Sequence, residues 1–77
     1  MDELFDTMLK LSTTDMRSFR MGQETYDQLR TLGFFSEHLL FNHMPIVIEY
    51  KLELGKVMAK GVPIDTKEWH GVFGSAR

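Results

Sequence analysis

The segment from Pro45 to Gly61 constrains the fold most, because its residue pattern fits two kinds of secondary structure. Its apolar residues alternate with polar ones, as in a strand that has one buried face. These alternating apolar residues are Ile46, Ile48, Tyr50, Leu52 and Leu54. The segment also fits a helix, in which one polar stripe carries Glu49, Glu53, Lys56 and Lys60. The choice between strand and helix therefore decides the fold class.

Residue preferences favour the helix. A proline suits the first position of a helix, and the segment is rich in Glu, Lys, Leu, Met and Ala, which are strong helix formers. The residues from Lys60 to Pro63 follow the usual order of a C-cap glycine, an apolar residue and a proline. We therefore predict a helix over residues 45–60, although Gly55 weakens it by about 1 kcal/mol relative to alanine. The alternative is an α+β fold with a β-hairpin over residues 45–62.

Apolar residues at helical spacing predict further helices before this segment. The predicted helices cover residues 3–11, 16–21, 23–32 and 37–43. Gly33 stands where a left-handed residue would end the third of them, and Ser36 can cap the fourth. We therefore predict an all-α fold, a single small domain of four to five short helices over residues 1–77. Residues 65–77 are predicted to form a partly ordered C-terminal tail.

Composition limits the cellular context. The 77 residues include no cysteine, which excludes disulfides, thiolate metal sites and cysteine nucleophiles. Small secreted proteins usually depend on disulfides, so a cytoplasmic location is expected. The N-terminus lacks the pattern of a signal peptide. The longest apolar run, Met44 to Ile48, is far shorter than the ~20 residues that span a bilayer, so no membrane association is expected.

No motif indicates catalysis or a cofactor. His38 and His43 are five residues apart, whereas two metal ligands on one helical face need a spacing of three or four. No serine lies in a glycine-flanked nucleophile motif, and the glycines are too scattered to bind a phosphate. We therefore predict a protein that is not an enzyme and has no metal, no cofactor and no small-molecule substrate.

An excess of apolar residues is the strongest functional signal. From Phe34 to Leu54, twelve of twenty-one positions are apolar, more than a small lone domain easily buries. We predict that part of this region contacts a partner protein, a second copy of the chain, or both. The predicted contact residues are Phe34, Phe35, Phe41 and Met44, with Arg30, His38 and His43 as a polar rim.

The leading functional hypothesis is a small non-catalytic regulator or inhibitor, expected to be a homodimer, that masks a surface on a partner protein. Its size and lack of a catalytic motif are typical of phage and mobile-element regulators. The alternative is a helix-turn-helix transcriptional regulator over residues 15–32. Its DNA-contacting residues would be Gln23, Gln28, Arg17 and Arg20. The net charge of about −2 and the absence of a basic patch argue against nucleic-acid binding.

Overall fold

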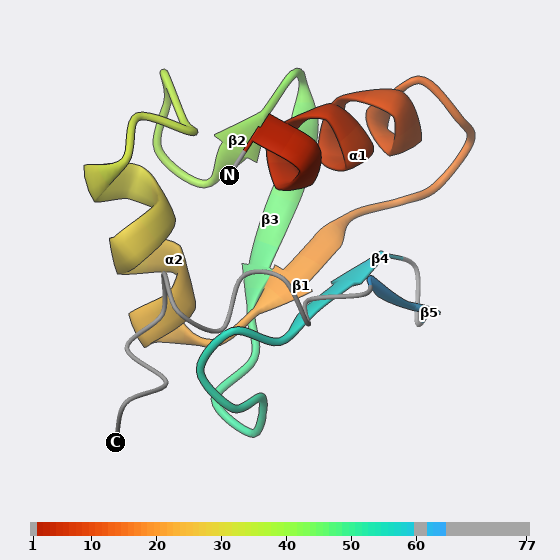
Figure 1. Cartoon of the computed structure of the whole chain (residues 1–77). Coiled ribbons are helices and arrows are strands. Elements are labelled where there is room, and N and C mark those ends of the chain that lie inside the picture. Colours follow the sequence, from red (N-terminus) through yellow and green to blue (C-terminus); the bar gives the residue numbers. More distant parts are fainter. Residues whose placement is uncertain (1, 60–61, 65–77) are drawn as a thin grey trace.

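The computed structural model describes residues 2–59 and 62–64 of the chain. In these residues two helices accompany a five-stranded mixed sheet (Figure 1). The elements in chain order are α1 (Asp2–Ser12), β1 (Phe19–Met21), α2 (Gln23–Thr31), β2 (Leu40–Phe41), β3 (Met44–Ile48), β4 (Val57–Ala59) and β5 (Val62–Ile64). The fold is therefore α+β, and the prediction of an all-α domain is wrong. The predicted tail over residues 65–77 lies outside the described residues.

The sheet is built around its earliest strand. The strand order is β2-β3-β1-β4-β5, and β1 lies parallel to β3 while the other neighbours are antiparallel. Phe19 pairs with Ile46 on one side and with Ala59 on the other. Helix α2 belongs to the connection between β1 and β3, since a parallel pair needs a crossover rather than a tight turn. The centre of the sheet therefore joins parts of the chain that are distant in sequence.

Two of the predicted helices are confirmed. The pattern over residues 3–11 corresponds to α1, and the pattern over residues 23–32 corresponds to α2. The end of α2 has the hydrogen bonds of a Schellman motif, in which Phe34 N–H donates to the Leu29 carbonyl and Gly33 N–H to the Arg30 carbonyl. Gly33 has a φ of +87°, the left-handed conformation expected of this glycine.

The predicted helix over residues 45–60 is absent from the described part of that segment. Residues 44–48 form β3, a turn-rich connection follows, and residues 57–59 form β4. Gly55 has a φ of +87°, which a right-handed helix does not allow. The alternative prediction is right in its α+β class, but its hairpin over residues 45–62 is wrong, because β1 lies between β3 and β4. Lys60 and Gly61 of the predicted C-cap lie outside the described residues.

The predicted helices over residues 16–21 and 37–43 are wrong as well. The first contains strand β1, and the second contains β2 within an ordered loop. Leu39, Asn42 and His43 all have positive φ values, which interrupt a right-handed helix. Asn42 and His43 form a two-residue turn between β2 and β3, whose dihedral signs match a type I′ hairpin turn. The Leu39 N–H donates a hydrogen bond of 2.8 Å to the Tyr26 hydroxyl, and this bond holds the Leu39 backbone in place.

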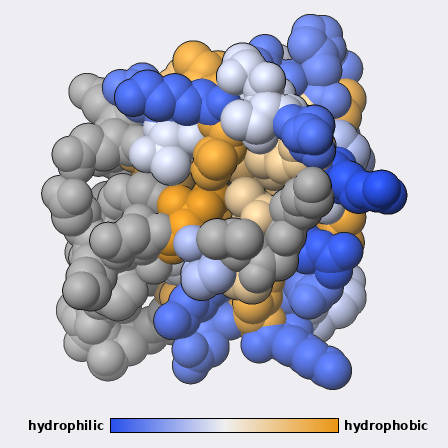
Figure 2. Space-filling view, turned by 90° about the vertical axis from the view of Figure 1, so that its right-hand side faces the viewer, coloured by the Kyte–Doolittle hydropathy of each residue, from blue (hydrophilic) through white to orange (hydrophobic). Residues whose placement is uncertain are grey.

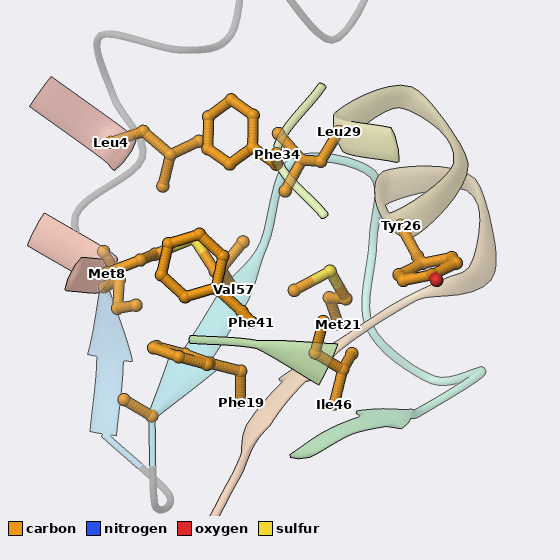
Figure 3. Packing of buried hydrophobic residues seen from close by; sticks show 12 residues of the cluster. Leu4, Met8, Phe19, Met21, Tyr26, Leu29, Phe34, Phe41, Ile46 and Val57 are labelled. Carbon is orange, nitrogen blue, oxygen red and sulfur yellow. The ribbon is translucent and has the colours of Figure 1, made fainter. Parts of the chain in front are cut away.

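The core lies between the two helices and one face of the sheet (Figures 1 and 3). It contains buried apolar side chains from both helices, from all five strands and from Phe34 in the loop after α2. These are Leu4, Met8, Phe19, Met21, Tyr26, Leu29, Phe34, Phe41, Ile46, Val57, Ala59 and Ile64. Because one cluster contains side chains of both helices, the helices cover the same face of the sheet.

The connection between β3 and β4 is fixed against the start of α2. Gly22 leaves room for it, because a Cβ atom there would lie 2.7 Å from the Leu52 carbonyl oxygen. Thr25 is fully buried, and its Oγ1 accepts a hydrogen bond of 2.9 Å from Gly55 N–H. The hydrogen bond to Thr25, together with the close approach that Gly22 permits, places this connection against the start of α2.

Candidate functional site

The second face of the sheet has no helix over it among the described residues. We call it the outer face and define it by Arg20, Pro45, Val47, Met58 and Pro63, which alternate with buried residues along their strands. Four of these residues are exposed and Met58 is half-buried. Four of the five are apolar. The outer face is therefore a small, mostly apolar surface on a rigid support.

The strand register aligns the outer face into one row. Arg20 pairs with Val47 on β3 and with Met58 on β4, and Met58 pairs with Pro63 on β5. Directly paired residues have Cβ atoms about 4.5–5.5 Å apart. Val47 remains 40% exposed although its strand lies inside the sheet. The row presents apolar side chains on both sides of one central arginine.

The apolar sequence of β3 is unusual for a strand with one open face. An antiparallel or mixed sheet with one solvated face normally alternates apolar and polar residues, whereas a strand covered on both faces reads as a continuous apolar run. Met44 to Ile48 is such a run, yet Pro45 and Val47 are exposed. This strand therefore has the sequence of one that is buried on both faces.

An ion pair provides the charge on the outer face. Arg20 Nη1 lies 2.9 Å from Glu49 Oε1, and the two side chains are 45% and 37% exposed. Glu49 directly follows β3, and its N–H donates to the Met21 carbonyl at the end of β1. An exposed pair of this kind contributes only about 0–1 kcal/mol to stability. Both charges therefore remain able to contact a partner at little cost to the fold.

Both edges of the sheet are poorly suited to binding an added strand. The edge strand β2 has only two residues, and the edge strand β5 contains Pro63, which has no N–H to donate. Short edge strands and prolines are common means by which proteins prevent edge-to-edge pairing. A contact made by this sheet is therefore expected to use its face rather than its edges.

Two of the predicted contact residues are in the core. Phe34 is 8% exposed and Phe41 is 2% exposed. The ring of Phe41 makes edge contacts with Phe5 and Phe19, at centroid distances of 5.4 and 5.7 Å. Figure 3 shows Phe34 and Phe41 among the aliphatic side chains of the core. Neither ring is therefore accessible to a partner on the surface of the folded chain.

The other predicted contact residues are more accessible. Phe35 and Met44 are half-buried, and the Phe35 ring stacks on Tyr26 at 4.9 Å. The predicted rim residues Arg30, His38 and His43 are exposed, but they lie on α2, in the following loop and at the hairpin turn. The ring of Phe35 contacts those of Phe34 and Phe41 at centroid distances of 6.2 and 6.1 Å, so the three predicted phenylalanines lie together with Phe35 at the edge of the core.

Apolar exposure is not confined to the outer face. Figure 2 shows the side with β4 and β5, which carry Met58 and Pro63 of the outer face, and hydrophobic surface lies there between hydrophilic side chains. Other exposed apolar residues lie on the helices. Phe5 and Leu9 on α1 are partly exposed, and Leu32 at the end of α2 is 48% exposed. Open hollows of about 320 and 280 Å³ lie on α2 and α1, next to Leu32 and Leu9 respectively. Exposure alone therefore does not select a site, and Leu32 is a useful control residue.

The described part of the chain has neither a cluster of metal-ligating side chains nor a helix that could cross a membrane. No three His, Asp or Glu residues there are placed to hold a metal ion. Neither α1 nor α2 is long and apolar enough to cross a membrane. Comparisons of the chain with protein-family models, with curated proteins and with solved structures gave no match.

Proposed function

We propose that this chain is a small non-catalytic protein-interaction module, a regulator or inhibitor that docks the outer face of its sheet on a partner protein. The observation that carries the proposal is the apolar run of β3, because its sequence suits a strand covered on both faces while Val47 is 40% exposed. A partner placed on this face would bury Val47, Pro45 and Met58 and would meet Arg20 at the centre.

This proposal keeps the predicted class of function and changes the predicted surface. The sequence pointed to Phe34 and Phe41 as anchors, but the core already uses both side chains. The outer face offers apolar side chains beside an arginine, a residue type that is enriched in protein interfaces and among their energetically dominant contacts. A cytoplasmic location remains part of the proposal, and its support is the absence of cysteine from the sequence.

The helix-turn-helix alternative lacks the first of its two helices. It needs a helix before the turn at Met21 and Gly22, and residues 19–21 form the central strand instead. The described structure therefore offers no recognition helix supported by a preceding helix.

A capture experiment tests the proposed function. The full chain is immobilised and exposed to a lysate of its native host, and the bound proteins are compared with those bound by Val47→Asp. We expect the specific partner to be lost with Val47→Asp, because the substitution places a charge in the middle of the apolar row. Since Val47 is exposed, the variant should keep the circular dichroism spectrum of the wild type.

Leu32→Asp is the matched control, because it places the same charge on a similarly exposed apolar residue away from the outer face. It should capture the partner as the wild type does. Capture that survives Val47→Asp, or that is lost only with Leu32→Asp, would show that the contact surface lies elsewhere.

A further inference from the structure

We propose that residues 35–39 form a loop that opens and closes while the rest of the fold stays intact, and that the Tyr26 hydroxyl controls this equilibrium. The structure is the closed form. Opening would expose the ring of Phe35, which is half-buried when the loop is closed. The loop packs on Tyr26, a core residue on the helix-covered side of the sheet, so the inference goes beyond the proposed function of the outer face.

The two ends of this loop are fixed independently of its middle. Phe34 is 8% exposed, and its N–H donates to the Leu29 carbonyl at the end of α2. Phe41 is 2% exposed and pairs with Met44 across the hairpin turn. The residues between these two buried phenylalanines can therefore move while both ends of the segment stay in the core.

The middle of the loop is folded around one side chain, that of Tyr26, which projects from α2 (Figure 3). The Phe35 ring stacks on the Tyr26 ring at a centroid distance of 4.9 Å and an interplanar angle of 9°. The His38 ring meets the same ring edge-on at 6.2 Å. The Leu39 N–H donates to the Tyr26 hydroxyl at 2.8 Å. Three residues of the loop therefore contact Tyr26.

Leu39 is the strained residue of the loop. Its φ of +55° lies in the left-handed region, which is unfavourable for a residue with a large side chain. Two hydrogen bonds hold it there, because its N–H donates to Tyr26 and its carbonyl accepts from the Ile46 N–H at 2.9 Å. Opening breaks both bonds but relieves the strain, which offsets part of the loss. Such strained residues are typical of segments that change conformation.

Amide hydrogen exchange of the wild type tests for the opening. The amides of Leu39 and Ile46 should be less protected than those of the central strand β1 (Phe19–Met21), which is paired on both sides. Their exchange should depend little on low concentrations of denaturant, because a local opening exposes little surface. Equal protection and equal denaturant dependence of all these amides would overturn the inference.

Tyr26→Phe tests the part played by the hydroxyl. The variant keeps the stacked ring but leaves the Leu39 N–H without its acceptor in the closed form. The protection of the Leu39 and Ile46 amides should therefore fall about tenfold. Unchanged protection of both amides would overturn the assignment of control to Tyr26.

Ile64→Val separates local opening from global unfolding. Ile64 is buried on β5, at the edge of the sheet opposite β2, so its contacts persist when the loop opens. Loss of one buried methyl group should lower the protection of the β1 amides about fivefold and leave Leu39 and Ile46 unchanged. A parallel loss at all these amides would show that the loop opens only when the chain unfolds, and would overturn the inference.

Two substitutions of Leu39 test the strain. Leu39→Gly and Leu39→Ala both remove the side chain, but only glycine adopts the left-handed conformation readily. The Ile46 amide should therefore be about fivefold better protected in Leu39→Gly than in Leu39→Ala. Equal protection would contradict the strain at this residue. None of these results bears on capture by the outer face, because the loop shares no residue with it.

Discussion

Replacing Phe41 with alanine should lower the free energy of unfolding by about 3–5 kcal/mol. Phe41 is 2% exposed, and its ring contacts the rings of Phe5, Phe19 and Phe35 at centroid distances of 5.4–6.1 Å. Removing the ring leaves a cavity between the N-terminal helix and the sheet. A domain of this size has only about 3–5 kcal/mol in its core, so much of the variant should be unfolded. Chemical denaturation followed by circular dichroism measures the effect.

Two further variants make this result interpretable. Phe41→Leu keeps most of the apolar volume and should lose less stability than Phe41→Ala, so a folded variant remains available. Leu32→Ala removes an exposed side chain and should change stability by no more than about 0.5 kcal/mol. If Phe41→Ala kept full stability and only lost partner binding, Phe41 would be the surface anchor that the sequence suggested.

Replacing Thr25 with valine should destabilise the fold by about 1–3 kcal/mol. The side chain of Thr25 is fully buried, and its Oγ1 accepts the Gly55 N–H at 2.9 Å. Valine has nearly the same shape but cannot accept this bond, so a buried N–H group loses its partner. The loss should loosen residues 49–56, which connect β3 to β4. Hydrogen exchange of the Gly55 amide should become faster in the variant.

Thr25→Ser is the matched control for this prediction. It keeps the hydroxyl and removes one methyl group, which costs about 1 kcal/mol of burial. The Gly55 amide should therefore remain protected in Thr25→Ser while it is exposed in Thr25→Val. Equal stability of Thr25→Val and the wild type would show that the hydrogen bond does not hold this connection.

The sequence was sufficient to predict the two helices. Their apolar residues repeat at helical spacing over two or three turns, and Gly33 marks the end of α2 by a conformation that glycine adopts readily. These signals are local, so they do not depend on the rest of the chain. The Schellman hydrogen bonds at Leu29 and Arg30 bear out this part of the prediction.

The strands could not be predicted in the same way, because each is short and finds its partner far along the chain. Strand β1 has three residues, and the spacing of Met16 and Phe19 resembles one turn of a helix. Its parallel pairing with β3 joins Phe19 to Ile46. The helix-forming residues after Ile48 are overridden by this pairing and by Gly55 at positive φ. Nothing in the sequence indicates that Leu39 adopts a positive φ, which is +55° in the structure.

The candidate site could be predicted only in part from the sequence. The apolar excess from Phe34 to Leu54 was real, but much of it is core, including Phe34, Phe41 and Ile46. Val47 and Tyr50 are the exposed large apolar residues of this region, and the place of Val47 within an unbroken apolar run was the available signal for the outer face. The sequence could not show that Arg20 and Met58 lie beside Val47, because only the strand register places these three side chains in one row.

The exposure of Val47 compared with that of Val57 tests the central claim most directly. The two valines lie on opposite faces of one sheet, 40% and 1% exposed respectively. In a dilute sample, a soluble paramagnetic agent should broaden the NMR signals of the Val47 methyl groups and leave those of Val57 sharp. Adding the captured partner should then protect Val47. Equal protection of both valines in the dilute sample would contradict the account, because the outer face would already be covered within the chain.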